Sequence, residues 1–169
     1  MKHAHEPYVH GRIRLRLLAE DDLQTTLEWR NRDGVREQFK SSDLLTYPQH
    51  HSWFVRYTEK PDDLVFIAEL VDTGERVGQV AIYAIDHGSR AAEIGRFVVS
   101  PDFQGRKLMK EAIDVLMRFA ASELSLTSVY LEVLESNERA GMLYQKLGFE
   151  ERGRADGLIR MERRIDDYV

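Results

Sequence analysis

The chain has 169 residues, enough for one domain with a substantial core and too few for two ordinary domains. Hydrophobic residues make up 43% and charged residues 31%, which is typical of a folded globular protein and not of a disordered one. The net charge of −5 argues against non-specific nucleic-acid binding as the main role. No apolar run approaches the roughly 20 residues that cross a bilayer. We therefore expect a cytoplasmic protein with neither a nucleic-acid nor a membrane partner.

The chain contains no cysteine, which excludes a disulfide, a thiolate nucleophile and a cysteine metal site, and we expect no metal. Residues 1–11 lack an apolar core and do not resemble a signal peptide. We expect them to form a flexible N-terminal segment that precedes a single domain over residues 12–169.

The first part of the chain predicts one strand and then helices. Residues 12–18 alternate arginine with leucine or isoleucine, which is the pattern of a half-buried strand. Three acidic residues at 20–22 favour the first turn of a helix that continues to about residue 32. After a break at Asp33 and Gly34, we expect a short helix over 35–39. Pro48 is well placed in the first turn of a further helix over 49–59.

The rest of the chain predicts a mixed sheet. Short turns join three apolar runs, which favours antiparallel hairpins; the runs are residues 63–70, 76–85 and 91–100. A helix after residue 109, a strand over 128–134 and a helix closed by Gly148 follow. Two strands, 149–155 and 158–165, end the chain. This order predicts a single-domain α/β fold with a mixed, mostly antiparallel central sheet and a β-α-β-α-β-β C-terminal half, whose strand–helix–strand over 98–134 is parallel.

The first candidate site is the turn FQGRKLM at residues 103–109. A strand that runs into the start of a helix exposes unpaired amides, which can hold a phosphate group. Arg106 and Lys107 add positive charge, whereas an ordinary strand-to-helix turn would explain the same pattern. From its composition alone the turn favours neither interpretation.

The second candidate site is NERAGMLYQKLGF at residues 137–149. Asn137 and Tyr144 are seven residues apart, so a helix places them on one face, two turns apart. A phenol beside a leaving group can donate a proton. The alternative is structural: Asn137, or Ser136 before it, caps the helix, and Tyr144 fills the core.

Taken together, the two motifs resemble the GNAT superfamily of acyl-CoA-dependent N-acetyltransferases. In that family a strand runs into Gln/Arg-x-x-Gly-x-Gly/Ala, and about 35 residues further on comes Asn-x-x-(Ala/Ser)-x-x-Leu-Tyr-x-(Lys)-x-Gly-Phe. Residues 104–109 match the first motif in part and residues 137–149 match the second almost fully. The predicted order of elements also fits the GNAT fold across the chain.

The resemblance implies acetyl-CoA as cosubstrate and assigns roles to particular residues. Tyr144 would protonate the departing thiolate. The backbone of residues 97–99 would pair with the pantetheine arm, the amides of residues 104–109 would hold the pyrophosphate, and Asn137 and Arg139 would contact the cofactor. In full, the expected cofactor-binding residues are Phe97, Val98, Val99, Gln104, Gly105, Arg106, Lys107, Leu108, Met109, Asn137 and Arg139.

Two residues depart from the family pattern. Lys107 replaces a glycine, and its side chain either crowds the phosphates or points outward and neutralises one of them. Met109 replaces a small residue and either narrows the cradle or tucks under the helix. These departures leave a second function class open, a non-catalytic domain that binds acyl-CoA as a sensor, although a sensor would have no need of Tyr144.

Glu93 is the candidate general base, because the family often has a carboxylate on this strand that deprotonates the amine directly or through water. A surface glutamate paired with Arg96 or Arg76 is the structural alternative. His51 and His87 are the rival bases.

The acceptor is expected to be a small-molecule amine. The N-terminal third resembles the branch that acetylates amino sugars carried on nucleotides, which implies acceptor binding by Arg30, Asn31, His51 and Trp53. The structural alternative is that the tryptophans fill the core while Arg30 and Asn31 brace the first helix. Two neighbouring branches remain open, the ribosomal-protein N-terminal acetyltransferases and the polyamine (spermidine) acetyltransferases. An exposed edge strand could also support a homodimer.

Overall fold

The computed structural model describes residues 2, 5–39 and 41–168, and the sheet is its central feature. Eight strands pair in the order β1-β2-β3-β4-β5-β6-β8-β7, and every neighbouring pair is antiparallel except β5 and β6. The strands are β1 (Tyr8–His10), β2 (Ile13–Leu17), β3 (Leu64–Leu70), β4 (Arg76–Asp86), β5 (Ala91–Val99), β6 (Ser128–Leu134), β7 (Glu150–Ala155) and β8 (Leu158–Arg164). This is the predicted mixed, mostly antiparallel sheet.

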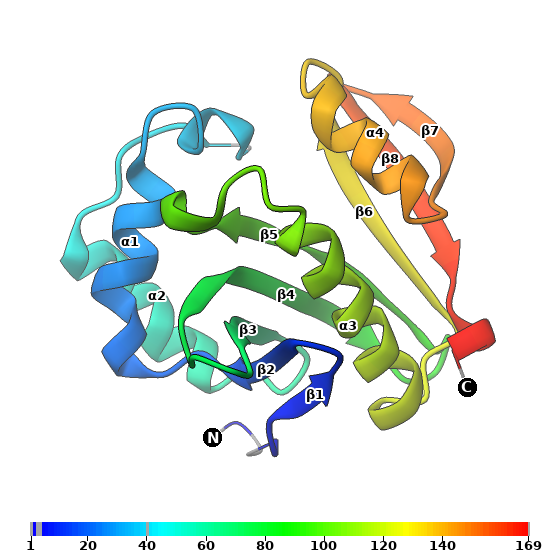
Figure 1. Cartoon of the computed structure of the whole chain (residues 1–169). Helices are drawn as coiled ribbons and strands as arrows, with labels where there is room; N and C mark the ends of the chain where they lie inside the picture. The colour runs from blue at the N-terminus through cyan, green and yellow to red at the C-terminus, as the bar shows by residue number, and fades with distance from the viewer. Residues whose placement is uncertain (1, 3–4, 40, 169) are drawn as a thin grey trace.

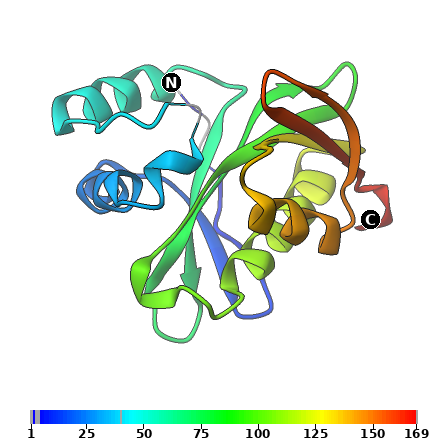
Figure 2. The same ribbon diagram turned by 90° about the horizontal axis from the view of Figure 1, so that it is seen from above.

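Within the described part of the chain, four α-helices cover the sheet from both sides (Figure 2). They are α1 (Leu23–Asn31), α2 (Tyr47–Thr58), α3 (Leu108–Glu123) and α4 (Glu138–Lys146). Strand β3 shows how both faces are filled: Phe66 packs with the α3 cluster, whereas Val65 and Ile67 pack with Trp29 of α1 and Tyr57 of α2. A strand buried on both faces reads as an unbroken apolar run, and residues 64–68 of β3 do so.

The predicted β-α-β-α-β-β C-terminal half is confirmed as β5-α3-β6-α4-β7-β8. Capping explains how α2 and α4 begin: the Asn137 side chain accepts from the amide of Ala140 (3.2 Å), and Thr46 caps α2 by accepting from Gln49 (3.3 Å). Two segments differ from the prediction. Residues 8–10 of the expected flexible N-terminal segment form β1, and the short helix expected over 35–39 is a single 3-10 turn, Arg36–Gln38. Met1, His3 and Ala4 of that N-terminal segment lie outside the described residues.

The parallel contact between β5 and β6 is short. It joins Ala91, Ala92 and Glu93 to Ser128, Val129 and Tyr130. Beyond Glu93, β5 stays paired with β4 on one side while β6 diverges with β8, β7 and α4, as Figure 1 shows. The two halves of the sheet therefore open away from each other, and the β6-facing backbone of β5 from Ile94 onwards is left without a strand partner among the described residues.

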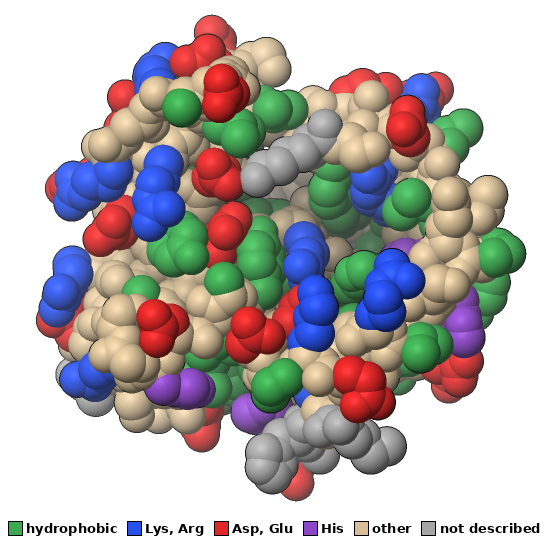
Figure 3. Space-filling view, turned by 180° about the vertical axis from the view of Figure 1, so that it is seen from behind, with side chains coloured by type: hydrophobic (Ala, Val, Ile, Leu, Met, Phe, Trp, Pro, Cys, Tyr) green, Lys and Arg blue, Asp and Glu red, His purple; other side chains and the backbone are tan. Residues whose placement is uncertain are grey.

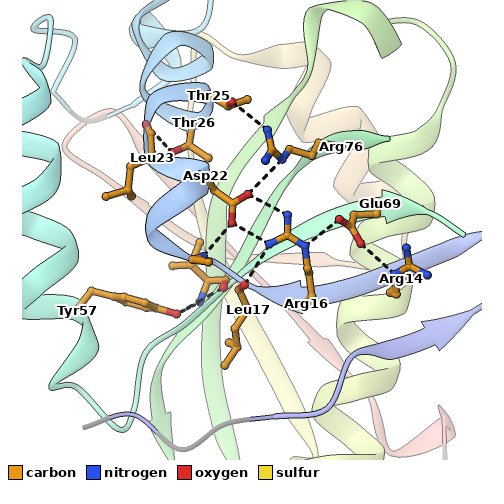
Figure 4. Close-up of polar contacts among 12 residues, drawn as sticks. Arg14, Arg16, Leu17, Asp22, Leu23, Thr25, Thr26, Tyr57, Glu69 and Arg76 are labelled. Carbon is orange, nitrogen blue, oxygen red and sulfur yellow. Dashed lines mark hydrogen bonds and ion pairs between the residues drawn. The ribbon is translucent and has the colours of Figure 1, made fainter. Parts of the chain in front are cut away.

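A charged network anchors α1 to the outer strands (Figure 4). The carboxylate of Asp22, 1% exposed, accepts from both terminal nitrogens of Arg16 (2.8 and 2.9 Å) and pairs with Arg76 (3.2 Å). Arg16 also donates to Glu69 (2.8 Å), which accepts from Arg14 as well (2.9 Å). Burial alone would raise the pKa of Asp22, but hydrogen bonds from Arg16 and Ala19 and the nearby positive charges bring that pKa below its usual value.

None of the helices in the described part of the chain has the length and apolarity that a bilayer span requires.

Candidate active site

The divergence of β5 and β6 creates a cleft of about 1060 Å³. Its walls come from β5, β6, α4, the turn that precedes α3, and the α1–α2 connection. Seen from behind, the surface is hollowed near the centre of the molecule, where side chains of both charge signs gather (Figure 3). A cleft of this size is large enough for a cofactor-sized ligand.

The turn at residues 104–109 forms one end of this cleft. Gly105 lies in the left-handed region at φ +77°, and a Cβ built on it would meet nothing within 4 Å. Of the amides of residues 104–109, only that of Arg106 has a backbone acceptor among the described residues, the carbonyl of Phe103 (3.4 Å). The turn therefore presents unpaired amides at the N-terminus of a 16-residue helix, which is the arrangement that binds phosphate.

The two residues that depart from the family motif keep its geometry in different ways. Lys107 is the N-cap of α3 and adopts φ 60° and ψ 16°, a left-handed conformation that glycine takes without strain. Met109 turns under the helix towards β4, since its Cε would lie 3.1 Å from a Cβ built on Gly78. Thus Lys107 preserves the backbone path of a glycine, and the bulk of Met109 packs partly against the core.

Positive charge lines the cleft around this turn. The lysine and arginine side chains that line it on α3 and α4, together with the N-cap, are Lys107, Lys110, Arg139 and Lys146. Coenzyme A carries a pyrophosphate and a further phosphate on its ribose, so these cations and the free amides together fit its polar end. Among the described residues, no group of three or more histidine and acidic side chains converges as a metal site.

Tyr144 lies at the middle of the cleft. It projects from α4, and its ring contacts Phe97 of β5 (6.0 Å between centroids) and Phe149 (6.1 Å). Burial raises the pKa of the Tyr144 phenol well above its usual value. The phenol therefore holds its proton at neutral pH and is available as a hydrogen-bond donor in the cleft. Asn137, expected to contact the cofactor, lines the cleft while it caps α4.

Glu93 also lines the cleft, at the point where β5 and β6 part. It accepts a hydrogen bond from the hydroxyl of Tyr83 on β4 (3.4 Å). The predicted rival bases lie elsewhere: His51 pairs with Glu20 on the surface (2.9 Å), and His87 is exposed in the β4–β5 turn. The cleft thus brings together Tyr144 and Glu93, and neither histidine lines it.

The other residues expected to bind cofactor divide between cleft and core. Phe97 and Val99 line the cleft with Gln104, Gly105 and Leu108. The Val98 side chain instead packs in the core between the sheet and the α1–α2 face, so only the backbone of Val98 is left to contact a cofactor. The Arg106 guanidinium lies over the Phe103 ring at 5.2 Å and does not line the cleft.

Of the four residues expected to bind the acceptor, only Arg30 lines the cleft. Its guanidinium lies over the Phe39 ring (4.1 Å) and donates to the carbonyl of Ser41 (2.8 Å), while its Nη1 atom is buried without a hydrogen-bond partner among the residues that the structure describes. Asn31 bridges to both backbone groups of Leu45 (2.7 and 2.9 Å). Trp53 stacks between His50 and Tyr57 on α2, as the structural alternative supposed.

Several residues that line the cleft were not predicted from the sequence. They include Gln38, Phe39, Tyr83, Arg96, Lys110, Glu132 and Lys146. Lys146 could have been found from its spacing of seven residues from Arg139 on one helix. Tyr83 and Arg96 carry no comparable signal, because their position depends on how β4 pairs with β5.

The fold and the cleft define the class of protein. The family model described as "Acetyltransferase (GNAT) domain" matches residues 12–150, so this chain belongs to the GNAT acetyltransferase family. It is an acyl-CoA-dependent N-acetyltransferase with acetyl-CoA as cosubstrate, as the resemblance of its two motifs implied.

Particular relatives narrow the comparison. The chain is 28% identical over 147 residues to the spermidine N(1)-acetyltransferase of Escherichia coli (strain K12), covering 87% of this chain and 77% of that protein. It is 32% identical over 160 residues to the "Putative ribosomal N-acetyltransferase" of Bacillus subtilis (strain 168), covering 89% and 85%. The crystal structure of spermidine N-acetyltransferase from Vibrio cholerae in complex with CoA and spermine superposes with a TM-score of 0.83 at 21% identity, covering 94% and 99%, and therefore has the same fold.

Proposed function

We propose that this protein transfers the acetyl group of acetyl-CoA to a primary amine of a polyamine such as spermidine. The observation that carries the proposal is the pair Tyr144 and Glu93 in one cleft, with the phosphate-binding turn at its end. Two spermidine acetyltransferases, one similar in sequence and one similar in fold, support a polyamine as acceptor by their names. The carboxylates of Glu93 and Glu132 in the cleft complement a polycation.

The proposed roles follow from proton balance. An aliphatic amine is protonated at neutral pH, with a pKa near that of lysine, so it must lose a proton before its nitrogen can attack. Glu93 would take that proton directly or through a water. The nitrogen then forms a bond to the thioester carbonyl carbon, the carbon–sulfur bond breaks, and the thiolate takes the Tyr144 proton. The nitrogen gives up its second proton to the tyrosinate, directly or through a water, which leaves the neutral amide and restores Tyr144.

The acceptor first expected, an amino sugar carried on a nucleotide, is less well supported. The relatives described above are named for polyamines or ribosomal proteins. Asn31, His51 and Trp53, which that interpretation needed at the acceptor, do not line the cleft. A protein N-terminal amine is the second candidate. The 32% identity to the Bacillus subtilis relative, which is named a putative ribosomal N-acetyltransferase, favours it.

Release of free thiol from acetyl-CoA over a panel of amines tests the proposal. The panel holds spermidine, spermine, a ribosomal-protein N-terminal peptide and a nucleotide-linked amino sugar. We expect turnover with the polyamines above all others. Turnover confined to the peptide or the sugar would contradict the polyamine proposal and assign the other acceptor.

Tyr144→Phe separates catalysis from binding. Loss of the acid that protonates the leaving thiolate should lower kcat about 10²- to 10³-fold. Acetyl-CoA should still bind to within a factor of about three by calorimetry, because the ring contacts with Phe97 and Phe149 remain. Tyr47→Phe, on the exposed face of α2, is the matched control and should retain full activity. Unchanged turnover in Tyr144→Phe would remove the tyrosine from the mechanism.

A further inference from the structure

Tyr83 and Gly95 are in contact beside Glu93, and neither residue belongs to the two motifs that the chain shares with the family. Tyr83 pairs with Glu93 across β4 and β5, and Gly95 lies two residues further along β5, on the same face of the strand as Glu93. A Cβ built on Gly95 would collide with the Tyr83 hydroxyl oxygen and would lie 3.3 Å from its Cζ atom. Because Gly95 has no side chain, the Tyr83 hydroxyl can occupy the space beside it. From that position the hydroxyl donates a hydrogen bond to Glu93 (3.4 Å).

The Tyr83 ring is held from its other side by Arg96. The guanidinium of Arg96 lies 4.1 Å from the ring centroid and donates to the carboxylate of Asp63 (2.8 Å), which is 5% exposed. A cation over an aromatic face and a buried ion pair together restrict where the ring can go. The hydroxyl is therefore placed by contacts that involve residues far apart in the sequence.

The backbone at Arg96 explains why this arrangement occurs at the cleft. Arg96 has φ 55°, in the left-handed region that non-glycine residues seldom adopt, and the register between β4 and β5 shifts across it, between Gly95 and Val98. Gln79 braces this irregularity by donating to the Arg96 carbonyl (2.9 Å). Such bulges re-aim side chains beside active sites. Here the bulge places the guanidinium over Tyr83.

Several other charged and titratable groups surround Glu93 and its two tyrosine neighbours, Tyr83 on β4 and Tyr130 on β6. These groups are Asp63, Asp86, Arg96, Glu132 and Arg160. Burial raises the pKa of the Tyr83 phenol far above its usual value, and the negative charge of Glu93 adds to that effect. The phenol consequently stays protonated across the neutral range and always has a hydrogen to donate.

We infer that Tyr83 is a positioning residue for the reaction: its hydroxyl, lodged over Gly95 and fixed by Arg96, orients the Glu93 carboxylate towards the cleft and favours its ionised form. The inference rests on the proposed role of Glu93 as the base that takes the proton of the acceptor amine. A distance of 3.4 Å is long for a strong hydrogen bond, but such contacts often tighten only when substrates bind.

Tyr83→Phe tests the inference, because it keeps the ring beneath Arg96 and removes only the hydroxyl. A direct readout needs no substrate: the carboxyl carbon signal of Glu93, assigned by its loss in Glu93→Gln, is titrated by NMR in the free protein. We expect protonation of Glu93 to move to higher pH by about 0.5 to 1 in the variant, because a donor to the charged form is lost. No movement overturns the inference, whichever amine proves to be the acceptor.

Steady-state kinetics test whether the hydrogen bond between Tyr83 and Glu93 contributes to the reaction. With the best amine of the panel, kcat should fall about 3- to 10-fold in Tyr83→Phe, the KM for acetyl-CoA should stay unchanged, and the acid limb of kcat/KM should move to higher pH. Tyr130→Phe removes the hydroxyl of the other neighbour of Glu93 and should leave the acid limb in place. An equal movement in both variants would overturn the specific role of Tyr83.

Gly95→Ala and Tyr83→Phe together form a double-mutant cycle, which tests whether the two substitutions act through the same contact. The Cβ that Gly95→Ala adds should displace the hydroxyl and reproduce the loss seen in Tyr83→Phe, whereas adding it to the Tyr83→Phe background should cost less than twofold more. Full additivity would mean that the Cβ acts by blocking a ligand, and would count against the inference. Failure of every polyamine as substrate, with the NMR titration as expected, would instead reject only the proposed acceptor.

Discussion

The substitution Asp22→Asn tests whether the charged network beneath α1 stabilises the fold. The Asp22 side chain is 1% exposed and meets Arg16, Arg76 and the amide of Ala19, the last at 2.8 Å. The amide nitrogen of asparagine can neither accept these hydrogen bonds nor neutralise the two guanidinium groups. Removing one partner of a buried ion pair typically destabilises by about 3–5 kcal/mol. We expect the lower end, because Arg16 keeps Glu69 and the arginine side chains reach water, with exposures of 26% and 38%.

This magnitude is measurable. For a chain of 169 residues, a loss of about 3 kcal/mol lowers Tm by about 6–12 °C. Urea unfolding at pH 7 followed by circular dichroism gives the free energy directly. Asp21→Asn is the matched control, since Asp21 precedes Asp22 in the same turn but is exposed, and it should change stability by less than about 0.5 kcal/mol.

The pH dependence supplies a second check. The pKa of Asp22 is lowered in the folded state, so the stability it contributes is present above its unfolded pKa of about 4 and is lost as pH falls through the folded value. The gap between the wild type and Asp22→Asn should therefore be constant from pH 6 to 8 and should close progressively below pH 4. A variant as stable as the wild type at pH 7, or a gap that widens in acid, would refute this account of the network.

Three further substitutions test the phosphate-binding turn and the strand beneath it. Lys107→Gly should raise the free energy of unfolding by about 0.5–1 kcal/mol, since relief of the left-handed strain exceeds the added freedom of the unfolded chain; a lower Tm would contradict this. Lys107→Gln should weaken acetyl-CoA binding a few-fold in calorimetry, and raised salt should shrink the difference. Gly78→Ala should lower stability by about 2 kcal/mol or more in urea, because its Cβ would meet the Val98 carbonyl and press on Met109. Stability unchanged in Gly78→Ala would show that β4 and β5 can separate freely there.

The sequence predicted the elements of this fold because the relevant signals are local. Alternating or continuous apolar runs identified β2 to β6, and a cap and a closing glycine identified α4 through Asn137 and Gly148. The spacing between residues 104–109 and 137–149 predicted the family, and its model matches residues 12–150. Those motifs also singled out the turn at residues 104–109 together with Asn137 and Tyr144, and all of these except Arg106 line one cleft.

The tertiary structure decided what depends on contacts between distant residues. The cleft exists because β5 and β6 pair over three residues and then part, which no local pattern records. Pairing across β4 and β5 joins Tyr83 to Glu93, and packing on α2 takes Trp53 away from the acceptor. Met109, a poor match to the motif, fits because Gly78, 31 positions earlier, leaves space for it. Hydrophobic periodicity specifies which face of an element is buried, but only the assembled sheet specifies which side chains meet there.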